Sequence, residues 1–270
     1  MTVQIRNDQQ VDLLSGDFFP RYEPNAAMVH AASVKQQQVA LRAYWPCSAQ
    51  IITAQSVFVT DQGGGGFHFP AFNAPTHASQ GLFPYVGFAS ASSQYLSIAD
   101  NAQFDITGTE TSVAAGFKGL TISFWVYFTE VGGAASIGLV SKWQTALPNQ
   151  KSYRVIRLPA NNIQFDVTTD GSTIVSVTST GTVAASTWYH IWARFVPSTT
   201  MTIAIDNSPT PLAAGVPASI YNSSAALEAA RTDGAGYLDG RLSQISICAS
   251  AALDVTMMTE YEQTRAWIGK

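Results

Sequence analysis

Apolar and polar positions alternate most regularly in the second half of the chain. In the segment 120–128, Ile122 and Phe124 fall on one face of an extended chain, whereas Ser123 and Trp125 fall on the other. This period of two is typical of a β-strand. Similar short runs follow one another along the chain and are separated by Gly, Asn, Asp and Pro. This succession of short strands and turns predicts an all-β fold, an antiparallel jelly-roll sandwich. The expected strands are 95–98, 120–128, 137–143, 153–158, 163–168, 173–179, 187–195, 201–207 and 238–247.

Local signals connect some of these runs. Asp170-Gly171 lies between two of them and favours a tight hairpin. The runs 187–195 and 201–207 are expected to be neighbouring strands of one sheet. Near the end, Asp254 is suited to cap a short C-terminal helix over about 254–268 that closes an edge or end of the sandwich. The expected sandwich-facing residues of that helix are Val255, Met258, Tyr261, Arg265 and Ile268.

Residues 1–80 differ from the remainder. Strand-like alternation appears at 39–45 and in a run from Gln50 that closes with Val57 and Val59, with a turn expected between them at 46–48. A loop is expected at Gly63–Gly66. We therefore expect an N-terminal extended arm with one hairpin over 1–80 and a sandwich over 81–270. The arm carries an aromatic group that either docks on a partner or packs back on its own sandwich. The docking candidates in this group are Phe18, Phe19, Arg21 and Tyr22.

Composition narrows the classes of function. Of the 270 residues, 12% are charged, about half the usual fraction of soluble domains, which is about 25%. Such a surface suits a protein that packs against others or belongs to a particle. The formal net charge is −4 and the 14 Lys and Arg residues are scattered, so no nucleic acid partner is expected.

No run is apolar over the roughly 20 residues that span a membrane, and the start lacks the pattern of a signal peptide. We therefore expect synthesis and folding in the host cytoplasm, or export by a route other than a cleaved leader.

Two cysteines, Cys47 and Cys248, lie far apart in the sequence. Their spacing fits no disulfide framework, and no leader directs the chain to an oxidising compartment. We expect free thiols, with Cys248 as a small buried apolar residue.

Six motifs follow one another along the second part of the chain. They are Thr121–Trp125, Val140–Trp143, Trp188–His190, Ile203–Asn207, Leu238–Gly240, and a closing helix with Leu253, Met257, Met258, Glu260, Tyr261 and Arg265. Their order resembles that of laminin-G-like, concanavalin A-like jelly-roll domains of bacterial and viral proteins. The resemblance covers about residues 85–270, with Asn207 where the family often has glycine. The stretch Ile106–Glu110 is similar to versions in tailed-phage structural genes.

Catalytic patterns are missing. Glycosidases on this fold carry E-x-D-x-x-E on a strand, which this chain lacks. Glu260 and Glu262 are close in sequence, but we expect them on a solvated helix face. His190 is expected at an outward or half-buried strand position, and His68 and His77 lack zinc-site companions. The sequence therefore predicts a non-enzymatic protein.

Calcium is the one cofactor that the resemblance brings in, because relatives bind it at the sandwich rim through Asp side chains and backbone carbonyls. The candidates are Asp166, Asp170, Asp206 and Asp239. Each also fits a turn in which Asp bonds its own backbone, and we favour the turns. No cofactor is therefore predicted.

The phage-like resemblance favours a virion structural protein, a capsid decoration or cement protein on the capsid exterior. It would bind major capsid protein subunits through residues 1–80 and would form a homo-oligomer. The alternative is a carbohydrate-binding adhesin or tail-fibre component, with Trp143, Trp188 and Trp192 as candidates to stack on sugar rings. A secreted hydrolase is a more remote third reading.

Overall fold

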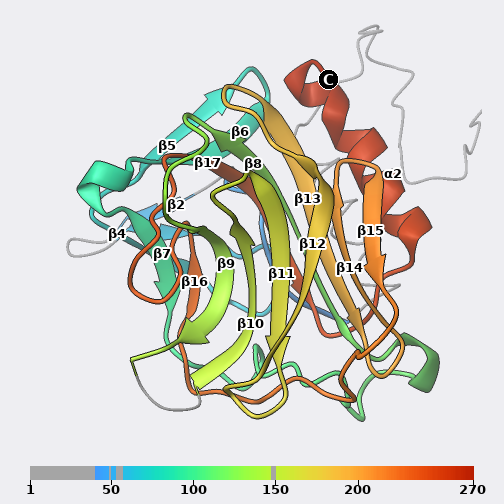
Figure 1. Ribbon diagram of the computed structural model, residues 1–270. Coiled ribbons are helices and arrows are strands. Elements are labelled where there is room, and N and C mark those ends of the chain that lie inside the picture. Colours follow the sequence, from blue (N-terminus) through green and yellow to red (C-terminus); the bar gives the residue numbers. More distant parts are fainter. Residues whose placement is uncertain (1–39, 49, 53–56, 147–149) are drawn as a thin grey trace, which may run out of the picture.

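The computed structural model describes residues 40–48, 50–52, 57–146 and 150–270. Two antiparallel sheets pack face to face and a helix lies outside one of them, which confirms the predicted sandwich (Figure 1). The first sheet is called sheet A. In spatial order it contains β15 (Ser208–Leu212), β14 (Thr200–Ile205), β13 (Trp188–Val196), β8 (Leu120–Phe128), β17 (Gly240–Cys248), β6 (Phe83–Phe88) and β5 (Thr76–Gln80). Its central strands β14, β13, β8 and β17 come from the most regular runs of the sequence.

Over the ranges that the structure describes, the second sheet, sheet B, has nine strands, one more than sheet A. It is strongly curved in Figure 1. Its strands follow the chain in order from β9 to β12, as expected for a meander. The Asp170-Gly171 turn joins β11 to β12, and Gly171 has a φ of 78° that favours glycine. In spatial order sheet B contains β12 (Ile174–Thr182), β11 (Asn162–Thr168), β10 (Gln150–Arg157), β9 (Ile137–Gln144), β16 (Leu227–Ala229), β7 (Tyr95–Ile98), β4 (Phe69–Phe72), β3 (Val57–Val59) and β2 (Gln50–Ile52).

The two faces of β8 behave as the alternation predicts. Ile122 and Phe124 are fully buried in the core between the sheets. Ser123 and Trp125 point to the outer face of sheet A, where the C-terminal helix covers them. The predicted neighbours β13 and β14 do pair, with Ala193 opposite Ile203.

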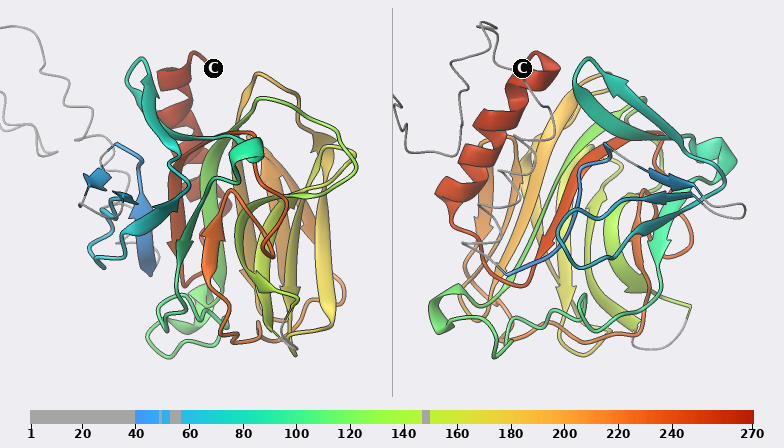
Figure 2. Two further views of the ribbon diagram at one scale, coloured as in Figure 1. Left: turned by 90° about the vertical axis from the view of Figure 1, so that its left-hand side faces the viewer. Right: turned by 180° about the vertical axis from the view of Figure 1, so that it is seen from behind.

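The C-terminal helix α2 (Asp254–Arg265) lies across the outer face of sheet A and continues into a 3₁₀ turn, η3 (Ala266–Ile268) (Figure 2). The predicted orientation of this helix is wrong, because Val255 and Met258 are 63% and 45% exposed. The predicted Asp254 cap is also wrong, since Leu253 is the N-cap residue and makes no side-chain capping bond. The buried residues of the helix are Thr256, Met257, Glu260, Tyr261 and Thr264.

Polar partners on the sheet explain this orientation. The Trp125 indole Nε1 donates a hydrogen bond to Thr264 Oγ1 at 3.0 Å, and Ser123 Oγ donates to Glu260 Oε1 at 3.0 Å. A helix that turned Val255 and Met258 inward would take these acceptors away from Trp125 and Ser123, and a buried donor that loses its acceptor costs about 1–3 kcal/mol.

Residues 40–80 form part of the sandwich. Strand β1 (Leu41–Trp45) pairs with β17, β2 to β4 extend sheet B, and β5 pairs with β6. The predicted hairpin between the runs at 39–45 and 57–59 is therefore wrong, and a boundary near residue 80 separates no two units of the described chain. A bulge in β17, with Gln244 at a φ of 49°, lets that strand pass from β6 to β1. The Gly63–Gly66 loop follows Asp61, whose carboxylate accepts from Gly63 N at 2.7 Å.

Cys47 and Cys248 are both free, as predicted, and both are buried, which was predicted for Cys248 alone. Burial raises the pKa of the Cys47 thiol to about 12. Within the described part of the chain, no helix is long and apolar enough to cross a membrane.

Candidate functional site

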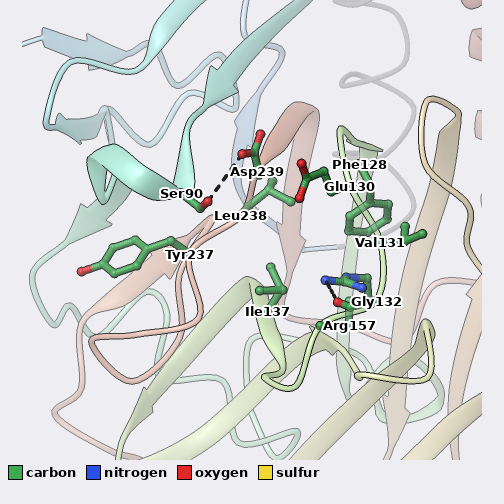
Figure 3. Close-up of a pocket in the computed structure, with 11 residues that line it drawn as sticks. Ser90, Phe128, Glu130, Val131, Gly132, Ile137, Arg157, Tyr237, Leu238 and Asp239 are labelled. Atoms are coloured by element: carbon green, nitrogen blue, oxygen red, sulfur yellow. Dashed lines mark hydrogen bonds between the residues drawn. The ribbon is translucent and has the colours of Figure 1, made fainter.

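A cavity of about 190 Å³ opens at the rim of the sandwich, where the end of β8, the start of β9 and the turn before β17 meet (Figure 3). Two carboxylates, Glu130 and Asp239, line it together with the Ser90 hydroxyl. Its apolar lining residues include Phe128 and Ile137. A few acceptors among apolar side chains are a common arrangement in small-molecule sites.

The position of Asp239 is fixed by its neighbours. Its backbone carbonyl accepts from Thr129 N at 3.0 Å, and its Oδ2 lies 3.5 Å from Ser90 Oγ. The next residue, Gly240, passes so close to β8 that an added Cβ would lie 2.1 Å from Tyr127 O. Glycine is therefore required at position 240. The close approach of Gly240 to β8 places the preceding residue of the Leu238–Gly240 motif, Asp239, at the rim.

Glu130 lies on the exposed loop that follows β8, and the buried Arg157 side chain bonds to this loop. Arg157 is 4% exposed and donates to Asn161 Oδ1 at 2.7 Å and to Gly132 O at 3.0 Å. Gly132 also donates its N–H to Asn161 Oδ1 at 2.6 Å. Gly132 and Gly133 have φ values of 85° and 88°, which suit glycine. Burial lowers the pKa of Arg157.

A row of stacked rings and a guanidinium adjoins the cavity on the outer face of sheet B. Phe72 stacks on Tyr95 with ring centroids 4.8 Å apart, and the Arg231 guanidinium lies 3.5 Å from the Tyr95 centroid. Tyr237 continues the row at 6.1 Å from Tyr95. In Figure 3 the Tyr237 ring points away from Glu130 and Asp239, toward the outside of the cavity. Phe72, at the end of the row, is 41% exposed.

The three tryptophans proposed from the sequence to stack on sugars are buried. Trp143, Trp188 and Trp192 are 2%, 5% and 1% exposed. The Arg154 guanidinium covers Trp143 at 4.1 Å, and Phe83 packs edge-on against Trp188 at 5.1 Å. Trp192 lies in the apolar layer beneath α2. None of the three therefore offers an open ring face. The alternation along a strand predicts which side a residue faces but not what covers that side, so their burial could not be predicted from it.

The other proposed contact residues, Phe18, Phe19, Arg21 and Tyr22, lie outside the described residues.

Glu260 and His190 differ from their predicted environments. Glu260 is only 6% exposed, so the expected solvated helix face is wrong, and His190 is fully buried. His190 Nε2 lies 3.7 Å from Glu260 Oε1. Helix α2 closes this group off from solvent, so it offers no access to a substrate.

The four aspartates weighed as calcium ligands are spread over the fold. Asp166 is fully buried and pairs with Arg154 Nε at 2.7 Å. Asp170 forms the expected turn, and the backbone N–H and hydroxyl of Thr173 lower its pKa. Asp206 pairs with Lys270, and Asp239 lies at the rim cavity. Among the described residues, no three His, Cys, Asp or Glu side chains gather closely enough to hold a metal.

Solved structures with the same fold are numerous, although no curated protein sequence matches the chain. The binding domain of Paraclostridial Mosquitocidal Protein 1 superposes with a TM-score of 0.63 at 12% identity, over 82% of this chain and 52% of that one. The botulinum neurotoxin serotype D ligand binding domain, in complex with N-acetylneuraminic acid, gives 0.60 at 10% identity, over 87% and 53%. This chain thus spans about half the length of these two domains.

A smaller domain matches over nearly its whole length. Domain 4 of AbnA, an extracellular GH43 arabinanase from Geobacillus stearothermophilus, in complex with arabinotriose, gives a TM-score of 0.58 at 10% identity, over 82% of this chain and 98% of that one. At such identities the similarity concerns the fold, which is that of lectin-like binding domains. The family described as the concanavalin A-like lectin/glucanases superfamily matches residues 90–254, more than half of the sequence. The chain belongs to this superfamily.

Proposed function

We propose that this protein is a non-catalytic carbohydrate-binding protein that takes a sugar at the rim cavity. The observation that carries the proposal is the pair Glu130 and Asp239 in the mixed polar and apolar lining of an open cavity. An ionised carboxylate only accepts hydrogen bonds, and sugar hydroxyls are abundant donors. Phe128 and Ile137 in the same lining suit the C–H face of a sugar ring.

Size and charge narrow the ligand. The cavity, at about 190 Å³, is below the roughly 300–1,000 Å³ of sites for drug-sized molecules. It therefore suits one sugar residue, with the remainder of a glycan outside. Two carboxylates and the Arg157 guanidinium line the space, and the partners of Arg157 are the uncharged Asn161 and Gly132, so the lining keeps a net negative formal charge. This balance favours neutral sugars and repels acidic ones such as N-acetylneuraminic acid.

The outer end of the stacked row supplies a second contact. Phe72 is 41% exposed and is held flat by Tyr95. A rigid exposed ring in the row that ends at Tyr237, a residue of the cavity lining, is a suitable stacking surface for a more distant residue of the glycan.

Binding is favoured over hydrolysis because the two carboxyl groups lack a catalytic setting. A glycosidase holds its acid and its base or nucleophile at fixed separation on either side of the scissile bond. Here Glu130 and Asp239 line one open cavity at the rim, and the chain lacks the E-x-D-x-x-E strand motif of glycosidases on this fold.

The virion hypothesis stays a prediction alongside this one. A glycan-binding sandwich carried on a virus particle would act as an adhesin, and attachment of residues 1–80 to major capsid protein on the capsid exterior would make it a decoration protein. Immunogold labelling of particles from the source lysate separates the two, since decoration predicts gold over the head and a tail adhesin predicts gold at the tail tip.

A glycan array with the full-length protein tests sugar binding. We expect hits among neutral oligosaccharides and weaker signals for their sialylated counterparts. Asp239→Asn and Glu130→Gln should each abolish the hits, whereas the matched control Glu262→Gln, an exposed carboxylate on α2, should keep them. An empty array, or hits that survive both rim substitutions, would overturn the proposal.

A further inference from the structure

Lys142 is a buried cation at the far end of β9 from the rim cavity. Its side chain is 0% exposed. Strand β9 begins at the cavity with Ile137, so Lys142 lies roughly 17 Å farther along the strand at the usual rise per residue. Burying an ammonium is costly unless it is paired and hydrogen-bonded, so its surroundings have to supply the compensation.

Four oxygen atoms surround the Lys142 ammonium. Nζ donates to the backbone carbonyls of Ser223 at 2.6 Å and Ala225 at 2.8 Å. It also donates to Asp100 Oδ1 and lies 3.1 Å from Asp105 Oδ1. An ammonium has three hydrogens to share, so four acceptors are more than it can use fully.

These partners come from two separate loops. Asp100 and Asp105 follow β7, whereas Ser223 and Ala225 precede β16. Tyr153, next to Lys142 on β10, donates to Phe104 O at 3.1 Å and lies among the same groups. Burial and the neighbouring carboxylates of Asp105 and Asp100 raise the pKa of Tyr153.

The set of oxygens is the kind that a hard metal ion selects. Two carboxylates and two main-chain carbonyls offer up to six oxygen atoms, and Ca²⁺ takes six to eight in a flexible geometry. Their formal charge of −2 is only half neutralised by the ammonium. Asp100 keeps 37% of its side chain exposed, which leaves an access path from solvent.

We propose that Asp100, Asp105, Ser223 and Ala225 form a cation cage in which the Lys142 ammonium occupies the place of a divalent metal ion such as Ca²⁺. The tethered cation joins the two loops to β9 and frees the fold from any need for the metal at this end. Removing the lysine side chain then converts the cage into a calcium site. The inference is independent of sugar binding at the rim.

Thermal unfolding of the full-length protein tests the cage. The melting temperature of the wild type should stay the same in millimolar Ca²⁺ and in EDTA. Lys142→Ala should melt lower than the wild type in EDTA, and Ca²⁺ at about 100 times its Kd should raise that melting temperature by about 5–10 °C. Terbium added to Lys142→Ala should luminesce through energy transfer from Tyr153.

Lys142→Met is the matched control, because its side chain fills the same space without charge. It should be destabilised like Lys142→Ala, yet show neither calcium stabilisation nor terbium luminescence. Adding Asp100→Asn and Asp105→Asn to Lys142→Ala should abolish both responses. Absence of calcium and terbium binding by a folded Lys142→Ala protein contradicts the proposal.

If Lys142→Ala does not fold with or without Ca²⁺, two other variants test the cage. Lys142→Met is compared with a triple variant that carries Lys142→Met, Asp100→Asn and Asp105→Asn. The triple variant should recover most of the melting temperature that Lys142→Met loses, because the unpaired charges are then removed. If the triple variant melts no higher than Lys142→Met, the carboxylates do not act as a cage for the cation and the proposal fails.

Discussion

Two regions of this protein contain the same kinds of polar side chain and differ in what covers them. Beneath α2, Glu260 lies with Ser123 and His190 on the outer face of sheet A. At the rim, Glu130 and Asp239 lie beside Ser90. Helix α2 covers the first group, in which Glu260 is only 6% exposed, whereas the second lines an open cavity (Figure 3). Residue type alone therefore does not mark a binding site, because access depends on elements that are distant in sequence.

The covered group has a structural task. Its carboxylate and hydroxyls bond to one another across the helix–sheet interface, and the rings of Trp125 and Tyr261 stack beside them at 5.8 Å. The rim group makes few contacts within the protein, so its oxygens are available to a ligand. The comparison leads to opposite expectations for substitutions in the two regions.

The largest effect on stability is expected beneath the helix. Trp125→Ala removes a fully buried ring and should lower the free energy of unfolding by about 3–5 kcal/mol, measured by guanidinium denaturation. Phe72→Ala, at an exposed ring, should cost less than about 1 kcal/mol. Equal losses would show that α2 does not seal the sheet as described.

A smaller effect is expected from one hydrogen bond in the same interface. Thr264→Val keeps the shape of the side chain but leaves the Trp125 indole N–H without its acceptor. The free energy of unfolding should fall by about 1–3 kcal/mol. Thr259→Val, at an exposed position on the same helix, should change it by less than about 0.5 kcal/mol. Matching values for the two variants would mean that the indole finds another partner.

Alkaline pH probes the buried Cys47 thiol. Its pKa is raised from 9.0 to about 12, so the folded state favours the neutral thiol. The corresponding stability is complete below pH 9 and is lost as the pH rises from 9 toward 12. At pH 8 we expect no reaction of the native protein with Ellman's reagent and two thiols titrated in guanidinium. Rapid labelling of the native protein would contradict the burial of Cys47 and Cys248.

The smallest stability effect is expected at the rim. Asp239→Asn removes a charge whose Oδ2 accepts only a long hydrogen bond, from Ser90 Oγ at 3.5 Å. The free energy of unfolding should change by less than about 0.5 kcal/mol. A loss as large as that of Thr264→Val would indicate a structural carboxylate, as beneath α2.

Sequence patterns predicted the sandwich better than the site. The bounds of β7 and β8 follow from alternation, because alternate burial is a local property of a strand. The orientation of α2 was predicted from its own apolar residues and is wrong, since the polar atoms it must satisfy belong to β8, far away in sequence.

The rim residues show the same limit. Asp239 stood out as part of a turn motif, but nothing in the sequence placed it beside Glu130. Glu130 itself was missed because it follows β8 on an irregular loop without periodicity. Its one available signal was position, since loops at strand ends commonly carry binding residues.

The most direct test of the central claim is calorimetric titration of the best neutral array glycan into the wild type and Asp239→Asn. Losing a charge-assisted hydrogen bond of about 1.5–3 kcal/mol should weaken binding about 10- to 150-fold, at unchanged stability. The sialylated form of the glycan should bind the wild type more weakly than the neutral form. Equal affinities of the wild type and Asp239→Asn would contradict sugar binding at the rim cavity.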